Sequence, residues 1–337
     1  IEAEHVDCLI AIYPHSNQGQ EGGRIGLHLE DQFINTLKDM PLLGKANRLS
    51  EQHHDWPIIE KISAACKKRD MLKTDNQVTT RAQTKTQDLV PPSGKKAFDI
   101  IRQRRSAVAM DGETTLEKSV FYRMLQRLQA ENHRHLEPGG LPWPPSISLF
   151  LFVHRVRGLD PGLYVLTSTA HHRDLLKKTL TSDFLWKKPE GCADDLELYL
   201  LLSQDLRQMA KTVSCGQDIA ADGAFSLGML AHFKPVILEK GASVYPRLFW
   251  EAGFIGQVLY LEAEAAGLQA TGIGCFFDDV MHDLLGITDL SWQSLYHFTV
   301  GGPKQDERLQ TRSAYHHLEP REHTEGCSDD LPARETT

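Results

Sequence analysis

A long polar stretch divides this chain and limits how it can fold. Residues 67–97 hold eight basic and three acidic residues, many threonines and glutamines, and few apolar side chains. Such a segment buries too little apolar surface to offset the entropy lost on ordering. We therefore expect a polar linker over 67–96. The residues before it offer too little for a convincing independent core, although a chain of 337 residues has room for roughly two typical domains.

Composition and charge narrow the class of protein. Hydrophobic residues make up 41% and charged residues 24%, and the mean hydropathy is -0.36, which is typical of a globular protein. The formal net charge is -8, so the chain has no surplus of the basic residues that nucleic-acid binding needs. No window approaches the ~20 apolar residues of a membrane span, and the first residues lack the layout of a secretory signal. We expect a cytoplasmic protein with neither nucleic acid nor membrane as a partner.

Cysteines and histidines do not form a metal motif. Six widely spaced cysteines without a CxxC pair fit neither a disulfide framework nor a zinc knuckle, so reduced thiols are expected. Cys215 and Cys275 are candidates for redox activity, but isolated cysteines on apolar elements are more often inert. Neighbouring histidines without HExxH spacing are expected on exposed loops. These pairs are 53/54, 133/135, 171/172 and 316/317.

After the linker, hydrophobic periodicity predicts alternating helices and strands. The turn over 158–162, with its proline and glycines, predicts a hairpin between the strands on either side. Helices are expected over 97–106, 116–130, 196–213, 246–267 and 279–286, and strands over 147–157, 163–169, 224–233, 268–277 and 294–302. Before the linker, a helix is expected over 56–68 and a short strand over 6–13, which could pair with the strand near Phe298.

The longest expected helix, 246–267, carries two interior glycines. Each of Gly253 and Gly256 costs about 0.5 to 1 kcal/mol relative to alanine. A backbone or a flat ligand that approaches the helix closely would explain them. Tolerated glycines in a buried helix would explain them equally well.

A cluster of arginines ends the first expected helix after the linker. Arg102, Arg104 and Arg105 precede Ser106, and guanidinium and hydroxyl groups together suit a phosphate. The alternative is a solvated basic helix end that complements the helix dipole. Both interpretations stay open on the sequence alone.

A second cluster, Gly272-Ile273-Gly274, follows an expected apolar strand. Glycines let backbone N–H groups face an approaching ring or anion, although a plain strand-end turn would use the same residues. The spacing does not match GxGxxG, and the chain contains no P-loop motif, so a nicotinamide-type Rossmann domain is disfavoured.

Five segments, taken in order, resemble the nitroreductase superfamily of flavin oxidoreductases, most closely its SagB or ThcOx-type dehydrogenase branch. The resemblance spans about residues 97–315. It implies an α+β fold, a nitroreductase-like FMN-binding sandwich with a mixed central sheet and a long central helix. It also implies FMN at the seam between two like domains, with ping-pong electron transfer. The segments are IIRQRRSAVAMDG (100–112), VRGLDPGLYVL (156–166), SCGQDIAADGAF (214–225), YPRLFWEAGFIGQVLYLEAEAAGLQATGIGCFFDD (245–279) and VGGPKQDERL (300–309).

The resemblance implies cofactor-binding residues at both clusters. Arg104 and Ser106, with Arg105 beside them, correspond to the family's phosphate and ribityl contacts. Gly272, Ile273 and Gly274 correspond to the backbone segment that lines the isoalloxazine ring in the family.

Three further positions complete this comparison. Gln257 corresponds to a polar amide in the central helix, and Arg308 to a late basic residue that reaches the phosphate. Val108 departs from the pattern, because many relatives place a second Lys or Arg there. Loss of that cation would leave the reduced, anionic flavin less stabilised.

The resemblance also implies a domain organisation. Residues 1–66 resemble a remnant of, or connector from, a preceding nitroreductase-like domain, and 67–96 is the linker. The nitroreductase-like FMN-binding domain is expected over 97–318, followed by a polar tail over 319–337. Because the family's cleft lies between two domains, we expect a homodimer or a pseudo-dimer with a second nitroreductase-like domain.

The implied activity is hydride transfer through flavin N5 to or from a small organic substrate, with NAD(P)H as a candidate donor. A peptide-modifying, azoline-type dehydrogenase is an alternative, but its expected adjacent Lys-Tyr pair is here separated into Lys240 and Tyr245. Tyr245 is the candidate catalytic proton donor, and a packed tyrosine with a surface hydroxyl is the simpler interpretation. A flavin-free scaffold or binding protein is the alternative from outside the enzymes.

Overall fold

The computed structural model describes residues 56–67, 94–129, 141 and 143–316, together with the single positions 35 and 39. The strand expected over 6–13, most of the linker and the tail over 319–337 lie outside these described residues. The helix expected over 56–68 is confirmed as α2, Pro57–Cys66.

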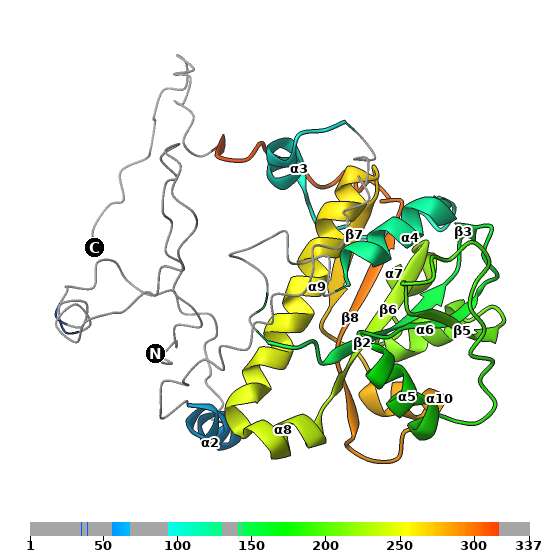
Figure 1. The fold of residues 1–337 in the computed structure, drawn as a ribbon. Helices are drawn as coiled ribbons and strands as arrows, with labels where there is room; N and C mark the ends of the chain where they lie inside the picture. Colours follow the sequence, from blue (N-terminus) through cyan, green and yellow to red (C-terminus); the bar gives the residue numbers. More distant parts are fainter. Residues whose placement is uncertain are drawn as a thin grey trace, which may run out of the picture.

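A six-stranded sheet forms the centre of the fold (Figure 1). Its order is β5-β4-β2-β6-β8-β7, and each strand runs antiparallel to its neighbours. The parallel component of the expected mixed sheet is limited, among the described residues, to a bridge between Ser106 and Ala270 at the β7 edge and to the small pair β1-β3. The strands are β1 Leu116–Glu117, β2 Ile147–Val153, β3 Val156–Arg157, β4 Gly162–Leu166, β5 Leu198–Ser203, β6 Phe225–His232, β7 Gln269–Ile273 and β8 Trp292–Gly301.

Helices cover both faces of this sheet, which makes an α+β sandwich (Figure 1). One face carries α4, Lys118–Arg127, and the long central helix α9, Tyr245–Ala265. The helices that pack on the other face are α5 Ala170–Thr179, α6 Arg207–Val213, α7 Ile219–Asp222 and α10 Asp278–Leu285. Outside these layers lie α3 Ala97–Gln103, α8 Lys234–Lys240 and η2 Ala242–Val244. None of the described helices combines the length and apolar composition that crossing a bilayer requires.

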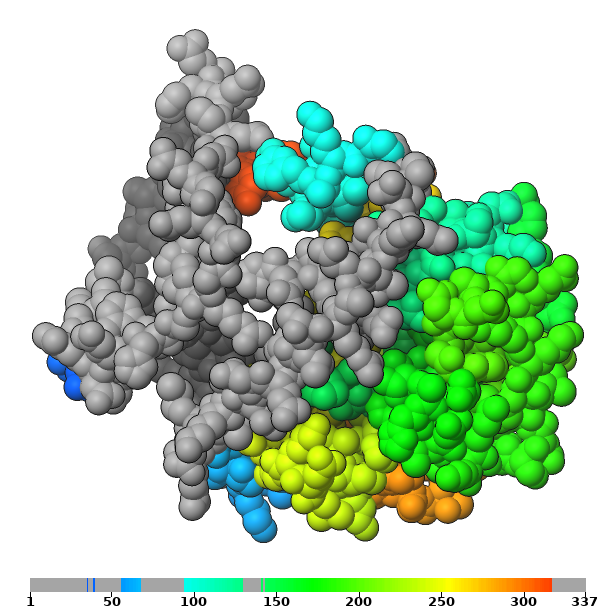
Figure 2. All heavy atoms as spheres, viewed as in Figure 1, coloured from blue at the N-terminus to red at the C-terminus, as the bar shows by residue number. Residues whose placement is uncertain are grey.

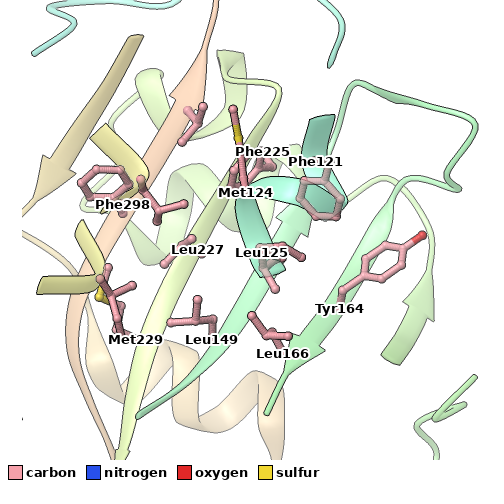
Figure 3. Close-up of a cluster of buried hydrophobic side chains, with 14 of the residues drawn as sticks. Phe121, Met124, Leu125, Leu149, Tyr164, Leu166, Phe225, Leu227, Met229 and Phe298 are labelled. Atoms are coloured by element: carbon pink, nitrogen blue, oxygen red, sulfur yellow. The ribbon is translucent and has the colours of Figure 1, made fainter. Parts of the chain in front are cut away.

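Side chains alternate between two cores along each central strand. Leu149 of β2 points into a first core with Phe121 and Met124 of α4 (Figure 3). Leu151 of β2 belongs to the same core. Phe150, between the two leucines, points into a second core on the opposite face. Since both faces are buried, the strands are continuous apolar runs rather than alternating ones.

This double burial explains the one clear error in the predicted elements. Residues 196–213 were expected to be a single helix, but they form the strand β5 and then α6. Leu200 of β5 joins the first core and Leu201 the second, so the run lacks the alternation that marks a strand exposed on one face. A short apolar run of this kind cannot be distinguished from a buried helix by periodicity.

The expected helix over 246–267 and the expected hairpin are both confirmed. β2 and β4 pair antiparallel, with Val153 opposite Gly162. Within α9 a close approach occurs at Gly256, where an added Cβ would lie 3.4 Å from the Phe298 ring. At Gly253 an added Cβ would meet nothing within 4 Å, so this glycine is not required by packing among the described residues.

The expectation of reduced thiols is wrong for one pair of cysteines. Cys215 and Cys275 form a disulfide with their Cα atoms 5.8 Å apart, across a sequence separation of 60 residues. The turn after α6 brings Cys215 to the turn after β7, a proximity that sequence spacing does not reveal. Cys66 and Cys192 are free.

Candidate functional site

The side chain of Tyr260, on α9, joins the two segments that the sequence singles out. Its hydroxyl accepts a hydrogen bond of 3.0 Å from the backbone N–H of Gly272. The same hydroxyl lies 3.0 Å from Ser106 Oγ. Because Gly272 already donates to the tyrosine oxygen, the Tyr260 proton is available to donate to Ser106. The arginine segment and the glycine segment therefore meet at one oxygen atom.

Backbone contacts place the Ser106 segment along the free edge of β7. Ser106 bridges Ala270 in parallel, and the N–H of Ala107 donates to the carbonyl of Ala270 at 3.0 Å. The Thr271 hydroxyl donates to the Ala107 carbonyl. The helix expected over 97–106 consequently ends at Gln103, since the next residues are extended alongside the sheet.

Arg104 lies directly after α3, and its guanidinium sits over the Tyr260 ring at 4.6 Å from the ring centre. The backbone N–H of Arg104 donates to the Ile100 carbonyl and so caps the end of the helix. The side chain is half-buried. A cation, a hydroxyl and a backbone N–H thus surround the Tyr260 side chain.

The side chain of a second tyrosine, Tyr296, leaves no room for a side chain at position 272. A Cβ added at Gly272 would lie 2.9 Å from Cε1 of Tyr296 and closer still to its hydroxyl. Burial raises the pKa of Tyr296, and the nearby Tyr260 adds to the effect. At Gly274 the space is more open, because an added Cβ would meet only the Tyr296 ring, at 3.9 Å. Gly274 is exposed and is the better placed of the two glycines to receive a flat ligand.

Arg105 and Ile273 have structural partners. The Arg105 guanidinium donates to the carbonyls of Arg102, Arg104 and Arg312. These bonds hold α3 against the chain near residue 312, where Figure 2 shows the cyan surface of α3 beside the orange-red surface of that segment. Ile273 is buried in the second core and pairs with His297 of β8.

Three other candidates lie apart from Tyr260. Gln257 is exposed on α9, about one helical turn before Tyr260. Arg308 pairs with Asp306, at 2.7 Å between Nη2 and Oδ2, and its side chain is 89% exposed. Tyr245 begins α9 and packs edge-on against Phe249, about 22 Å along the helix axis from Tyr260.

The residues around Tyr260 fit a group with several acceptor oxygens, such as the phosphate and ribityl chain of a flavin mononucleotide. The Arg104 guanidinium and the Ser106 hydroxyl supply complementary donors. Ser106 Oγ and the Gly272 nitrogen are less than about 6 Å apart, since each lies 3.0 Å from the same oxygen. The second cation that the resemblance expects is missing, because Val108 stands there with 63% of its surface exposed.

Two cavities of about 400 Å³ lie elsewhere in the molecule. The first is lined by residues of β1, α4 and the end of α9, including Lys95, Glu117 and Leu268. A shallow, charged second cavity is lined by α6 and α7, including Arg207 and Asp222. Arg104, Ser106, Tyr260 and Gly272 line neither of them. Within the described residues, no cluster of three or more His, Cys, Asp or Glu side chains is arranged to hold a metal ion.

Sequence reasoning missed Tyr260. In the sequence it is one more apolar residue of a helix, and its spacing suits the core. The signal that could have found it is chemical, because a tyrosine in a packed helix needs a hydrogen-bond partner for its hydroxyl.

The solved structures that match this chain include three proteins of different description. A protein of Anabaena variabilis assigned to the nitroreductases is 24% identical, with 62% of this chain and 38% of that chain covered and a TM-score of 0.48. This chain therefore spans well under half of that protein's length. The microcin synthetase McbBCD complex of Escherichia coli, with truncated pro-MccB17 bound, is 13% identical over 80% of this chain and 87% of that chain, with a TM-score of 0.44. The NADPH:FMN oxidoreductase of Vibrio harveyi, in complex with NAD+, is 12% identical over 72% and 80%, with a TM-score of 0.38.

The sequence itself gives a family match. No match was found among curated proteins. Residues 163–302, which run from β4 to just past the end of β8, match the model of the nitroreductase family. These residues include α9, Tyr260 and the Gly272 segment. The six-stranded sheet with helices on both faces is the nitroreductase-like α+β fold that the sequence predicts. Over residues 163–302 this chain is therefore similar to the nitroreductase family.

Proposed function

We propose that this chain is an FMN-dependent oxidoreductase of the SagB or ThcOx-type branch, acting on a small organic substrate. The match of residues 163–302 to the nitroreductase family supports oxidoreductase chemistry in general. The observation that carries the proposal is the meeting of Ser106 and Gly272 at the Tyr260 hydroxyl beneath Arg104. FMN, when bound, supplies the hydride-transfer chemistry at its N5 atom.

Arg104 and Ser106 are proposed to hold the phosphate and ribityl oxygens. In the structure Arg104 has an aromatic partner, and an exposed cation–π contact contributes about 0.5–1 kcal/mol. A charge-assisted hydrogen bond to phosphate contributes about 1.5–3 kcal/mol. The exchange of one partner for the other is therefore favourable.

The backbone of Gly272, Ile273 and Gly274 is proposed to lie against the flavin ring. Buried Ile273 anchors this backbone in the second core. Exposed Gly274 leaves room for a flat group beside the Tyr296 ring. The role of these residues is to position the ring and to exclude water from one of its faces.

The remaining contacts stay predictions. The roles proposed for Arg105 at the phosphate and for Gln257 at the ring rest on the resemblance alone. Arg308 is held by an exposed ion pair with Asp306, which contributes little and can be exchanged for a phosphate. Tyr245 stays a proposed proton donor, although its packing against Phe249 favours a structural role.

A partner domain, a donor and a location complete the proposal. Since Ser106 and Gly274 are both exposed, a second nitroreductase-like domain, in a homodimer or pseudo-dimer, would cover the open side of the cofactor. NAD(P)H is the proposed donor and the cytoplasm the proposed location. A nitro compound, a quinone, oxygen or a precursor peptide is the proposed acceptor class to be tested.

One observation favours a second candidate function. Val108 is an exposed apolar residue where relatives are expected to carry a cation. A chain that retains the fold without stabilising reduced flavin would serve as a flavin-free scaffold or binding protein.

The visible spectrum distinguishes the two candidates. Purified protein, supplied with FMN and then desalted, is expected to be yellow, with a flavin band near ~450 nm. Reduction by NADH or NADPH should bleach the band, and a nitroaromatic, a quinone or a precursor peptide should restore it. Colourless protein that takes up no FMN, at any protein concentration that allows dimers to form, would contradict the enzyme proposal and favour the scaffold.

A further inference from the structure

The disulfide between Cys215 and Cys275 lies immediately beside the proposed flavin-contacting segment. Cys275 directly follows Gly274. Cys215 follows the end of α6 and has a φ of 56°, in the left-handed region that is uncommon for a residue other than glycine. Both cysteines lie in turns rather than in a helix or strand. Breaking the bond therefore releases two turns without opening either core.

Gly272 and Ile273 are held by pairing with β8, and the disulfide is one of a few contacts that hold the next residues, Gly274–Phe277. The Gln217 amide donates to the Cys275 carbonyl at 3.2 Å, and the N–H of Phe277 donates to the Val213 carbonyl at 2.8 Å. The Phe276 ring stacks on the His297 ring, with centres 4.5 Å apart. Gln217 lies two residues after Cys215, and Val213, the last residue of α6, lies two residues before it. The covalent bond is thus the strongest link between the turn at Cys215 and the segment Gly274–Phe277.

Exposure separates this pair from the free cysteines. Cys275 is exposed and Cys215 is half-buried, so a small thiol can reach the bond. In contrast, burial raises the pKa of the Cys192 thiol to about 11, and burial also raises that of Cys66. Since the thiolate is the reactive form, a raised pKa makes these two thiols less reactive than an ordinary cysteine at neutral pH.

We propose that Cys215 and Cys275 form a thiol–disulfide exchange site that takes a dithiol as its reactant and controls the backbone of Gly274 and Cys275, directly after β7. One thiolate of the dithiol attacks the disulfide and forms a mixed disulfide. The second thiol of the reactant then displaces the remaining cysteine. The protein disulfide gains two electrons and two protons to become two thiols, and the dithiol becomes a disulfide. Reduction frees the segment, and oxidation fixes it where FMN is proposed to bind, a consequence that rests on the proposed function.

Thiol mapping and hydrogen exchange test this inference on the full chain without FMN. Native protein is treated with dithiothreitol, alkylated and mapped by mass spectrometry. We expect new alkylation at Cys215 and Cys275. Amide exchange in residues 274–277 should rise by about tenfold or more, while exchange in α9 stays constant. Reoxidation should restore the slow exchange.

Three variants provide the controls. The double variant Cys215→Ser/Cys275→Ser should exchange quickly in residues 274–277 with or without dithiothreitol. The variant Cys192→Ser should respond to dithiothreitol as the natural chain does. The conservative double variant Cys215→Ala/Cys275→Ala should match the serine pair. If the double variants do not fold, the natural chain alone decides the question.

No new alkylation at Cys215 and Cys275 under native conditions would overturn the inference, as would new alkylation with unchanged exchange in residues 274–277. Neither readout involves FMN. A chain that binds no flavin would therefore contradict the proposed function and leave the result on the disulfide intact.

Discussion

The backbone N–H of Gly272 donates a 3.0 Å hydrogen bond to the hydroxyl of Tyr260. This bond ties the end of β7 to the middle of α9, and the same hydroxyl reaches Ser106 from the segment after α3. Three parts of the chain that are far apart in the sequence are thereby held together at one oxygen. The two segments proposed to contact FMN are thus positioned before any ligand arrives.

Removal of that oxygen should weaken FMN binding. In Tyr260→Phe the ring under Arg104 stays, but Gly272 and Ser106 lose their shared partner. FMN must then order both segments as it binds, and we expect a loss of about 0.5–1.5 kcal/mol in binding free energy, the contribution of a typical hydrogen bond. Quenching of flavin fluorescence during a titration measures this.

The matched control is Tyr296→Phe, because the Tyr296 hydroxyl also lies against Gly272 but shares no hydrogen bond with its N–H. The affinity of Tyr296→Phe for FMN should stay close to that of the natural chain. Equal losses of FMN affinity in Tyr260→Phe and Tyr296→Phe would show that the two hydroxyl groups act only through packing, and would contradict the role of the shared hydrogen bond.

Alanine at two glycines should have opposite effects on stability. In Gly272→Ala the new methyl group overlaps the Tyr296 ring, 2.9 Å away at Cε1, and overpacking costs about 1–3 kcal/mol. In Gly253→Ala the methyl group has open space on α9, and replacing a helical glycine stabilises by about 0.5–1 kcal/mol. Urea unfolding measures both, and destabilisation by Gly253→Ala would reveal a contact from outside the described residues.

The sequence predicts the helices and strands well where hydrophobic periodicity reports burial. The long run that begins at Pro246 gives α9 to within two residues at each end, because its apolar positions recur at helical spacing over five turns. The run at Leu198 misleads, because leucines bury both faces of β5 and remove the alternation. Turn residues such as Pro161 predict the hairpin because their local geometry does not depend on distant contacts.

The candidate site is predictable only in part. Arg104, Ser106 and Gly272 carry recognisable chemistry, and their meeting agrees with the resemblance that first linked them. Tyr260 carries no such signal, because its role depends on where β7 ends in space. Pairing of Cys215 with Cys275 is equally invisible, since 60 residues separate them and only the packing of α6 beside the β7 turn brings them together.

A buried carboxyl group should make stability depend on pH. Glu251 of α9 is 3% exposed, and Oε1 accepts hydrogen bonds from the N–H groups of Ser146 at 2.8 Å and Ile147 at 2.9 Å. Burial raises its pKa to about 7, although these two bonds act in the opposite direction. The folded state therefore holds the proton more tightly than the unfolded state, whose pKa is near the ordinary 4.5.

The sign follows from this difference. The stabilisation is fully present below the ordinary pKa and is lost as the pH rises from about 4.5 through about 7, by on the order of 3 kcal/mol. Glu251→Gln keeps an acceptor oxygen but does not titrate. The unfolding free energy of the natural chain minus that of the variant should therefore fall over this range. A difference that is flat in pH would contradict the assignment.

The central claim is that Arg104 binds the phosphate of FMN, and the most direct measurement is the affinity of two arginine variants for FMN. Arg104→Ala removes the cation over Tyr260, whereas Arg102→Ala removes an equally charged neighbour that lies over Phe98 and Tyr315. We predict that Arg104→Ala weakens FMN binding by about 1.5–3 kcal/mol, roughly tenfold to 150-fold, while Arg102→Ala changes it less than about twofold. Unchanged affinity in Arg104→Ala, or an equal loss in both variants, would contradict the account.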